Sequence, residues 1–223
     1  MQKGIKFRIY PNKEQQNLIN QTLGCCRLIY NKGLAMRNEA YESGNKIGYA
    51  QTSAMLTELK KCEDFAFLKV VDSIALQQSL RDLDRGFVNF FQKRAAHPTF
   101  KSKHNRHQSY RTVNQGNNIR IAGKYIKLPK LGYTKIRQSM EVGKINNVTI
   151  KCTPAGKYFA VLNVEFEPQP RANNGGCIGI DVGIKDFYSD SNGKVASNPK
   201  YLEKSMRKLI REQRMLSRKP KGS

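Results

Sequence analysis

The sequence contains no tryptophan, no Cys-x-x-Cys pair and no apolar run of the roughly 20 residues that a membrane-spanning helix needs. It therefore predicts no transmembrane segment, and the alternating first ten residues do not resemble a signal peptide. The cysteines are odd in number and scattered, which favours reduced thiols in a cytosolic protein and predicts no zinc module within this chain. They are Cys25, Cys26, Cys62, Cys152 and Cys177.

Acidic residues are also scarce, with 17 Asp and Glu against 40 Lys and Arg among 223 residues. The formal net charge is +23 and the isoelectric point is about 10.0, so the partner is expected to be a polyanion. Nucleic acid is favoured over a membrane surface because long apolar segments are lacking. We expect a soluble, cytoplasmic nucleic-acid-binding protein of one large or two small domains.

The chain begins with a predicted strand, because residues 3–10 alternate apolar and polar side chains. Asn12 and Gln15 form the pattern of a capping box, so a long helix is expected to begin there. Gly24 and Gly33 lie within this helix, where each costs about 1 kcal/mol relative to alanine. They are expected to let another helix or a nucleic-acid backbone approach closely.

Two further helices are predicted, over residues 52–61 and from Asp72 to residue 91. The second carries a continuous apolar stripe, which indicates a core-facing surface. Its polar side is a candidate for base recognition because glutamine can pair with adenine in the major groove, although an exposed glutamine is most often only solvated. The polar residues concerned are Gln77, Gln78, Arg81 and Arg85.

Residues 93–111 interleave basic side chains with rings, a composition typical of segments that follow a phosphate backbone. The alternative is a flexible solvated loop, and both descriptions hold if the loop orders on binding. The candidate contacts are Lys101, Lys103, Arg106, Tyr110 and Arg111. His104 and His107 lack a second ligand pair, so a zinc site is not favoured there.

Glycine turns then separate short strands, which predicts hairpins over residues 119–128 and 148–166 and a small barrel that the first strand could join. Residues 168–176 have the composition of a linker, so a domain boundary is placed there. The expected fold class is α+β.

Residues 177–187 are mostly apolar but contain Asp181, which Val182 and Gly183 follow. Burying an unpaired carboxylate costs several kcal/mol, and coordination of a divalent cation removes that objection. The pattern is how an RNase H-like nuclease domain begins, with the first strand presenting a carboxylate to metal. The alternative is a strand-end aspartate that caps its own turn.

A basic helix is expected to begin at Asn198-Pro199. Glu203 and Glu212 on it are interpreted as surface charges that make i,i+4-type pairs. The RNase H-like sheet has barely begun where the sequence stops at Ser223, so we expect a truncated domain.

Seven segments together resemble the TnpB family, also called OrfB, of insertion-sequence proteins once labelled helix-turn-helix transposases. They are residues 7–12, 28–31, 49–53, 100–103, 127–132, 179–187 and 216–219. The resemblance runs the length of the chain and implies an RNA-guided DNA endonuclease, whose partners are a transposon-encoded guide RNA and target double-stranded DNA.

The resemblance also implies a domain plan. Residues 1–10 and 96–172 would form a wedge-like β-barrel, interrupted by a helical recognition lobe over residues 11–95. Residues 173–223 would begin a RuvC nuclease domain of RNase H-like fold. The complete protein would use Mg²⁺, and Zn²⁺ only where the family's later cysteine-rich ribbon is present.

For individual residues, the resemblance implies that Asp181 is the first catalytic, metal-binding carboxylate. Tyr49 and Gln77 would contact the target-adjacent motif, and Ser73 lies where a close relative has lysine, so the motif preference is expected to differ. Gln51 is a further candidate for contact with nucleic acid.

Three hypotheses remain open at this point. The first is the N-terminal portion of a nuclease that cuts only when completed, because the family's later carboxylates are absent from this sequence. The second is a cleavage-dead, RNA-guided DNA-binding protein or repressor. The third is a general basic RNA-binding protein without a guide.

Overall fold

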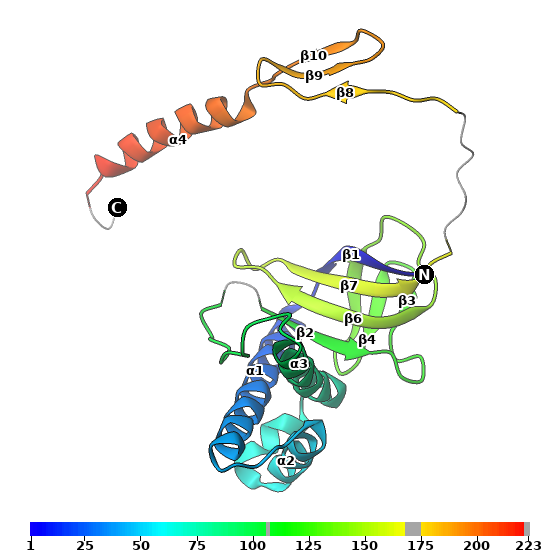
Figure 1. Ribbon diagram of the computed structural model, residues 1–223, viewed down its shortest axis with the longest axis vertical. Coiled ribbons are helices and arrows are strands. Elements are labelled where there is room, and N and C mark those ends of the chain that lie inside the picture. Colours follow the sequence, from blue (N-terminus) through cyan, green and yellow to red (C-terminus); the bar gives the residue numbers. More distant parts are fainter. Residues whose placement is uncertain (106–107, 168–174, 221–223) are drawn as a thin grey trace. The chain divides into compact units, whose positions relative to one another are not determined.

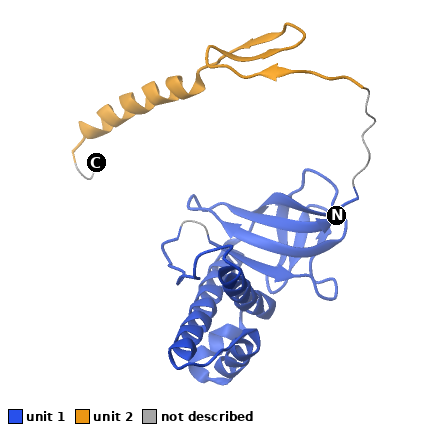
Figure 2. Ribbon diagram, in the orientation of Figure 1, with its two compact units in different colours: residues 1–168 blue, residues 169–223 orange. Residues whose placement is uncertain are grey.

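The computed structural model describes residues 1–105, 108–167 and 175–220 and divides into two compact units, residues 1–168 and 169–223 (Figure 2). The predicted boundary between residues 172 and 173 lies outside the described residues. Within the described residues, no helix is long and apolar enough to cross a membrane.

A seven-stranded antiparallel sheet organises the first unit, in the order β2-β6-β7-β1-β5-β4-β3 (Figure 1). The strands are β1 (Gln2–Tyr10), β2 (Gln108–Val113), β3 (Arg120–Ala122), β4 (Tyr125–Leu128), β5 (Gly132–Arg137), β6 (Ile145–Cys152) and β7 (Tyr158–Glu165). The expectation that the first strand joins the later hairpins is confirmed, because β1 pairs with both β7 and β5.

The sheet is curled into a half-barrel (Figure 1), so the prediction of a small barrel holds only in this open form. The strands β2 and β3 are its two edges. Asn114, just after β2, spans the gap between them: its amide donates to the carbonyl oxygens of Ile119 and Ile145, and its Oδ1 accepts from the Ile119 amide. The Asn114 side chain thus links the segment just before β3 to the start of β6.

Strict alternation along β1 fixes the two faces of the sheet. Ile5, Phe7 and Ile9 are buried in the core, whereas Lys6 and Arg8 point to the outer face. The predicted hairpins β3–β4 and β6–β7 are present, with Gly123 and Gly156 at positive φ in the turns. The strands β2 and β5 were not expected from the sequence.

Three helices and a 3₁₀ segment lie between β1 and β2 in the sequence: α1 (Lys13–Glu42), α2 (Tyr49–Lys61), η1 (Glu63–Lys69) and α3 (Ser73–Phe91). The capping box at Asn12 and Gln15 is present as predicted. The Gln15 amide also donates to the carbonyl oxygens of Leu131 and Tyr133, which fixes the start of α1 against the sheet.

The close approach predicted for Gly33 is confirmed, because a Cβ there would lie 2.8 Å from Cδ2 of Leu80 and 3.1 Å from Cδ2 of Leu83. At Gly24 no helix approaches closely, because nothing lies within 4 Å of a Cβ at that position, and the approach of a nucleic-acid backbone there stays a prediction. Only Gly33 therefore lets α1 and α3 pack closely.

The second unit contains β8 (Ile180–Asp181), β9 (Asp186–Asp190), β10 (Val195–Ser197) and α4 (Tyr201–Ser217). The predicted helix start at Asn198-Pro199 is wrong, because α4 follows Lys200 in a left-handed conformation. Asn198 does not cap the helix but forms two other hydrogen bonds. Its Oδ1 accepts from the Lys200 amide, and its Nδ2 donates to the Ile184 carbonyl. Glu203 and Glu212 lie near Lys200 and Arg211, so their pairs are i,i+3 and i,i+1 instead of i,i+4.

We predict that Gly33→Val lowers the free energy of unfolding by about 1–3 kcal/mol, because the new methyl groups overpack the leucines of α3. Gly24→Val is the matched control within the same helix and should change the value by less than about 1 kcal/mol. Urea denaturation followed by circular dichroism measures both. Equal destabilisation would mean that the cost comes from helix propensity and not from the packing of α1 against α3.

Candidate nucleic-acid interface

Helix α3 presents a polar face because its opposite side is committed to the core. Leu76, Leu80 and Leu83 are fully buried, and the Asp72 carboxylate caps the helix by accepting from the Ile74 amide at 2.9 Å. The i, i+4 spacing then places Ser73, Gln77 and Arg81 along one exposed stripe. Ser73 and Gln77, both predicted to contact nucleic acid, thus share one exposed helix face.

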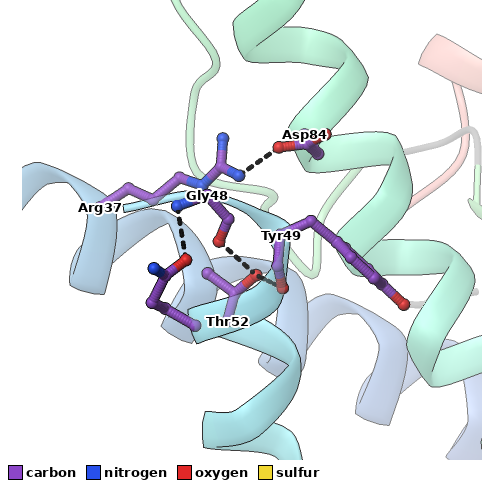
Figure 3. Close-up of polar contacts among 6 residues, drawn as sticks. Arg37, Gly48, Tyr49, Thr52 and Asp84 are labelled. Carbon is purple, nitrogen blue, oxygen red and sulfur yellow. Dashed lines mark hydrogen bonds and ion pairs between the residues drawn. The ribbon is translucent and has the colours of Figure 1, made fainter. Parts of the chain in front are cut away.

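Tyr49 joins this face from the first turn of α2. The Arg81 guanidinium lies over its ring, with 4.8 Å between the guanidinium carbon and the ring centroid. The turn is held from inside by Thr52, whose hydroxyl donates to the carbonyl oxygens of Gly48 and Tyr49 (Figure 3). A buried threonine thus fixes the aromatic ring that supports the arginine.

Gln51 caps helix α2, a role that was not predicted from the sequence. Its side-chain oxygen accepts from the Gly48 amide at 2.9 Å and so caps α2. A Gly-x-x-Gln sequence is compatible with such a capping box, but the helix was predicted to begin at residue 52, after this cap. Gln51 remains exposed, although its oxygen is already used.

An ion pair that was not predicted connects α1 to α3. The Arg37 guanidinium donates to Asp84 (Figure 3). Its carbon also lies 4.7 Å from the centroid of the Phe87 ring. The Arg37 side chain is 7% exposed and the Asp84 side chain 37% exposed. Asp82 on the same helix pairs with Arg111 of β2. Both acids of α3 are therefore neutralised by other elements.

Arg81 and Arg85 remain as the uncompensated cations of α3, since neither forms an ion pair within the described residues. They line a cleft of about 700 Å³ together with Tyr49, Arg111 of β2 and Asn147 of β6. This α3–β2 cleft joins the helical face to the sheet, and its positive charge suits a phosphate backbone.

The basic segment over residues 93–111 is held at Lys101 by hydrogen bonds to Asn31 of α1. The Asn31 side chain donates to the Lys101 carbonyl at 3.0 Å and accepts from its amide at 2.9 Å. The Lys101 ammonium lies 3.9 Å from the centroid of the Tyr30 ring, and partial burial lowers its pKa, opposed by Asp82. Lys103 is exposed, so both lysines remain accessible cations.

Tyr110 does not fit the stacking role expected for it. Its side chain is 6% exposed because it points into the core from β2, and burial raises the pKa of its hydroxyl. Arg111, the next residue, faces outward and pairs with Asp82. His97 is also occupied, with its ring edge-on to Phe87 and Phe90. Arg106 and His107 lie outside the described residues.

Asp181 lies in the two-residue strand β8, opposite Ser189 of β9. The expectation of a buried strand is wrong for the described residues, since Ile180 and Val182 are 60% and 72% exposed. Asp190 is engaged in its own turn, where its Oδ1 accepts from the amides of Asn192 and Lys194. In the described part of the chain, no group of three or more His, Cys, Asp or Glu could hold a metal ion.

We predict that Asp84→Asn lowers the free energy of unfolding by about 1–3 kcal/mol, because it leaves the nearly buried Arg37 guanidinium without its charge partner. The expected loss in the free energy of unfolding is smaller than for a fully buried ion pair, because Asp84 is partly solvated. Asp64→Asn, an exposed aspartate of η1, is the control and should stay within about 0.5 kcal/mol. Denaturant titration that finds both variants alike would show that the ion pair contributes nothing.

Comparisons with known proteins give the following matches. A family model described as "Helix-turn-helix domain" matches residues 1–46, and one described as "Probable transposase" matches residues 161–223. A "Putative RNA-guided DNA endonuclease" of Streptomyces pristinaespiralis is 36% identical over 228 residues, covering 100% of this chain and 56% of that protein. InsQ of Escherichia coli K12, named in the same words, is 37% identical over 222 residues, covering 98% of this chain and 54% of InsQ.

The chain thus spans about half the length of these curated relatives. Among solved structures, one named "Cryo-EM structure of CRISPR-Cas12f Ternary Complex" matches with a TM-score of 0.42 and 12% sequence identity. The match covers 95% of this chain and 55% of that chain.

Proposed function

The chain belongs to the OrfB family of insertion-sequence proteins, also called TnpB, and we propose that it supplies the RNA- and DNA-binding portion of an RNA-guided DNA endonuclease. The observation that carries the proposal is the similarity along the whole chain to relatives bearing that name. The net charge of +23 agrees with it, because a guide–target duplex is held through its phosphates.

In this proposal, base pairing between a guide RNA and one DNA strand selects the target, and the protein reads only a short adjacent motif. The polar face of α3 is the proposed reading element. Gln77 is exposed on it and can donate to and accept from one base, while Arg81 and Arg85 hold the flanking phosphates. Tyr49, Gln51 and Ser73 border the same face and are proposed as secondary contacts.

The helical segment over residues 11–95 is proposed as the recognition lobe, and the half-barrel with residues 96–172 as the wedge. The tethered Lys101 and the exposed Lys103 lie a few residues before the start of the half-barrel strand β2. They are proposed as guide-backbone contacts, together with Arg106 and Arg111.

For cleavage, a RuvC-type centre uses two metal ions held by several carboxylates. The described residues do not fit such a centre, because no group of three or more His, Cys, Asp or Glu among them could hold a metal ion. We therefore assign no catalytic step to this chain, and propose Mg²⁺ for the complete protein with Asp181 as one ligand. Zn²⁺ is proposed only for a protein that carries the family's cysteine-rich ribbon.

A second candidate is RNA-guided binding without cleavage, in the manner of a repressor. The isolated and exposed position of Asp181 favours it for residues 1–223. Both candidates act on nucleic acid in the cytoplasm and require no membrane partner.

The test of guided binding is to sequence the RNA that copurifies with the protein when it is expressed beside its own flanking DNA. One enriched transcript from the end of the genetic element is expected. A spectrum of RNA that follows cellular abundance would contradict the proposal and favour general RNA binding.

We predict that Gln77→Ala relaxes the preference at one base of the adjacent motif by about 1–3 kcal/mol, because a side chain that pairs with a base edge is lost. Selection from a library of flanking sequences measures this preference. Gln92→Ala, in the exposed residue that caps the end of α3, serves as the control and should leave the motif unchanged. Uniform weakening at every sequence would instead assign Gln77 to backbone positioning.

We predict that Asp181→Ala abolishes cleavage by a protein of the relatives' full length but leaves its guide-dependent DNA binding intact. In residues 1–223 alone the substitution should change neither binding nor stability, because the side chain is exposed. Plasmid cleavage and gel-shift assays separate the two activities. Guided, Mg²⁺-dependent cutting by residues 1–223 would contradict the assignment.

A further inference from the structure

A cavity of about 330 Å³ lies between α1, α3, β2 and the segment over residues 101–105. This volume equals about eleven water molecules at roughly 30 Å³ each, and it falls at the small end of the range for ligand sites. Leu23, Cys26 and Ala75 contribute apolar surface, and most of the other lining residues are polar or charged. Such a mixed lining suits a small organic ion. We call this space the Tyr110 cavity.

The Tyr110 hydroxyl lacks a partner although the residue is only 6% exposed. It forms no hydrogen bond within the described part of the chain. It is also not one of the fully enclosed polar atoms there that lack a partner, so it opens into the cavity that the residue lines. The Nε atom of the next residue, Arg111, is enclosed and unpaired. Because buried polar groups are normally hydrogen-bonded, these two groups indicate an occupant that supplies the missing partner.

The charges around the cavity do not cancel. Arg27, Lys101 and Arg111 line it together with a single acid, Asp82. Asp82 forms its ion pair with Arg111. Neither Arg27 nor Lys101 forms an ion pair within residues 1–105, 108–167 and 175–220, so two positive charges remain uncompensated at the cavity. Burial lowers the pKa of Lys101 even though Asp82 opposes the shift, so the ammonium is short of both water and counter-charge.

Two uncompensated positive charges match a dianion. A phosphomonoester carries a charge of about −1.5 to −2 at pH 7 and three strong acceptor oxygens. A phosphodiester of a nucleic-acid backbone carries only one negative charge. Hydroxyl donors for the oxygens are present, since Tyr110 is unpaired and the Ser102 hydroxyl only accepts, from the His104 amide at 3.1 Å. Charge and hydrogen bonding therefore favour the monoester.

The cation of the cavity is held in place without a ligand. The Asn31 side chain forms hydrogen bonds to both the amide and the carbonyl of Lys101. The Lys101 ammonium then lies 3.9 Å from the centroid of the Tyr30 ring. Because the segment is already fixed, an anion does not have to order it on binding, and less conformational entropy is lost.

We infer that the Tyr110 cavity binds an organic phosphomonoester, either as a free small molecule or as the terminal phosphate of a nucleic-acid strand. Arg27 and Lys101 supply the charge, and the Tyr110 hydroxyl supplies a hydrogen bond that the empty cavity leaves unmade. The inference goes beyond the proposed function, because it requires neither base pairing nor contact with a phosphodiester backbone.

The test is calorimetric titration of residues 1–223, freed of nucleic acid at high salt, with AMP and with cyclic AMP. The two probes share base and sugar, but cyclic AMP is a phosphodiester with one negative charge. AMP should bind about tenfold more tightly or better, because a hydrogen bond to a charged group contributes more than a neutral one. Equal affinities for the two probes would overturn the inference.

Tyr110→Phe separates the cavity from general attraction to a basic protein, because it removes a hydroxyl and no charge. The dissociation constant for AMP should rise about tenfold. The thermal unfolding midpoint should not fall, because the hydroxyl forms no hydrogen bond in the free protein. Tyr158→Phe is the matched control: that tyrosine is also buried, but its hydroxyl interacts with Asn20 and Cys152. It should lower the midpoint and leave AMP affinity unchanged.

A charge variant completes the set. Lys101→Gln should weaken AMP binding and narrow the difference between AMP and cyclic AMP, because one of the two uncompensated charges is gone. Lys69→Gln, an exposed cation of η1, should change neither quantity. Unchanged AMP affinity in Tyr110→Phe, or an equal loss in Tyr158→Phe or Lys69→Gln, would overturn the site.

The source of the phosphate is tested with a short single-stranded RNA that carries either a 5′-phosphate or a 5′-hydroxyl. A preference for the phosphorylated strand that Tyr110→Phe removes assigns the cavity to strand ends. No such preference beside tight AMP binding assigns it to a free ligand. Equal weakening of both strands by Tyr110→Phe would mean contact with phosphodiesters and would overturn the inference. Normal AMP binding with no enriched transcript in the purified protein would contradict the proposed function and leave this inference standing.

Discussion

The pairing of β1 between β7 and β5 is the interaction on which the rest of the first unit depends. The first strand of the chain is the central strand of the sheet, aligned with β7 from Gln2 opposite Glu165 to Ile9 opposite Tyr158. Its inward side chains lie in the same core cluster as Ile19 of α1 and Leu76 of α3. Without β1 the sheet would divide into two halves, and the helices would lose the surface that they pack against.

This arrangement also gives the two faces of each strand different roles. The inward face is apolar and binds the helices, so the outward face is free to carry almost unbroken positive charge. On α3 the same division holds, with leucines inward and Gln77 and Arg81 outward. A rigid core therefore holds two cationic surfaces in a fixed relation, joined at the α3–β2 cleft, and the cleft is where a bound nucleic acid would meet both.

Local signals in the sequence were sufficient for much of the fold. The capping box at Asn12, the cap at Asp72 and the glycine turns each involve residues close in sequence, and each is found as predicted. The strands β2 and β5 were missed because two of their inward, buried positions are the polar residues Thr112 and Thr134, which weaken the apolar half of the alternation. These two segments form strands because they pair with strands that are distant in sequence, β6 for β2 and β1 for β5, and this pairing half-buries even charged segments.

The same distinction applies to the site. The family resemblance predicts Gln77 and Ser73 as contacts, and the helical periodicity that places them on one face is local. The sequence could not show that Tyr110 is buried, that Gln51 caps its helix, or that Arg37 neutralises Asp84, because these depend on tertiary contacts. The surroundings of Asp181 depend on packing that the described residues do not supply, so its exposure was equally beyond local reasoning.

The central position of the first strand has a consequence for how the protein is made. During translation β1 leaves the ribosome before its partner β7, which follows about 150 residues later, on the order of 10 s at ordinary elongation rates. For that interval its hydrogen-bonding edges are open to any other nascent strand. Lys3, Lys6 and Arg8 give the waiting segment a positive charge that repels a second copy, as gatekeeper residues do in aggregation-prone strands. We therefore expect the basic residues of β1 to keep neighbouring chains on a polysome apart.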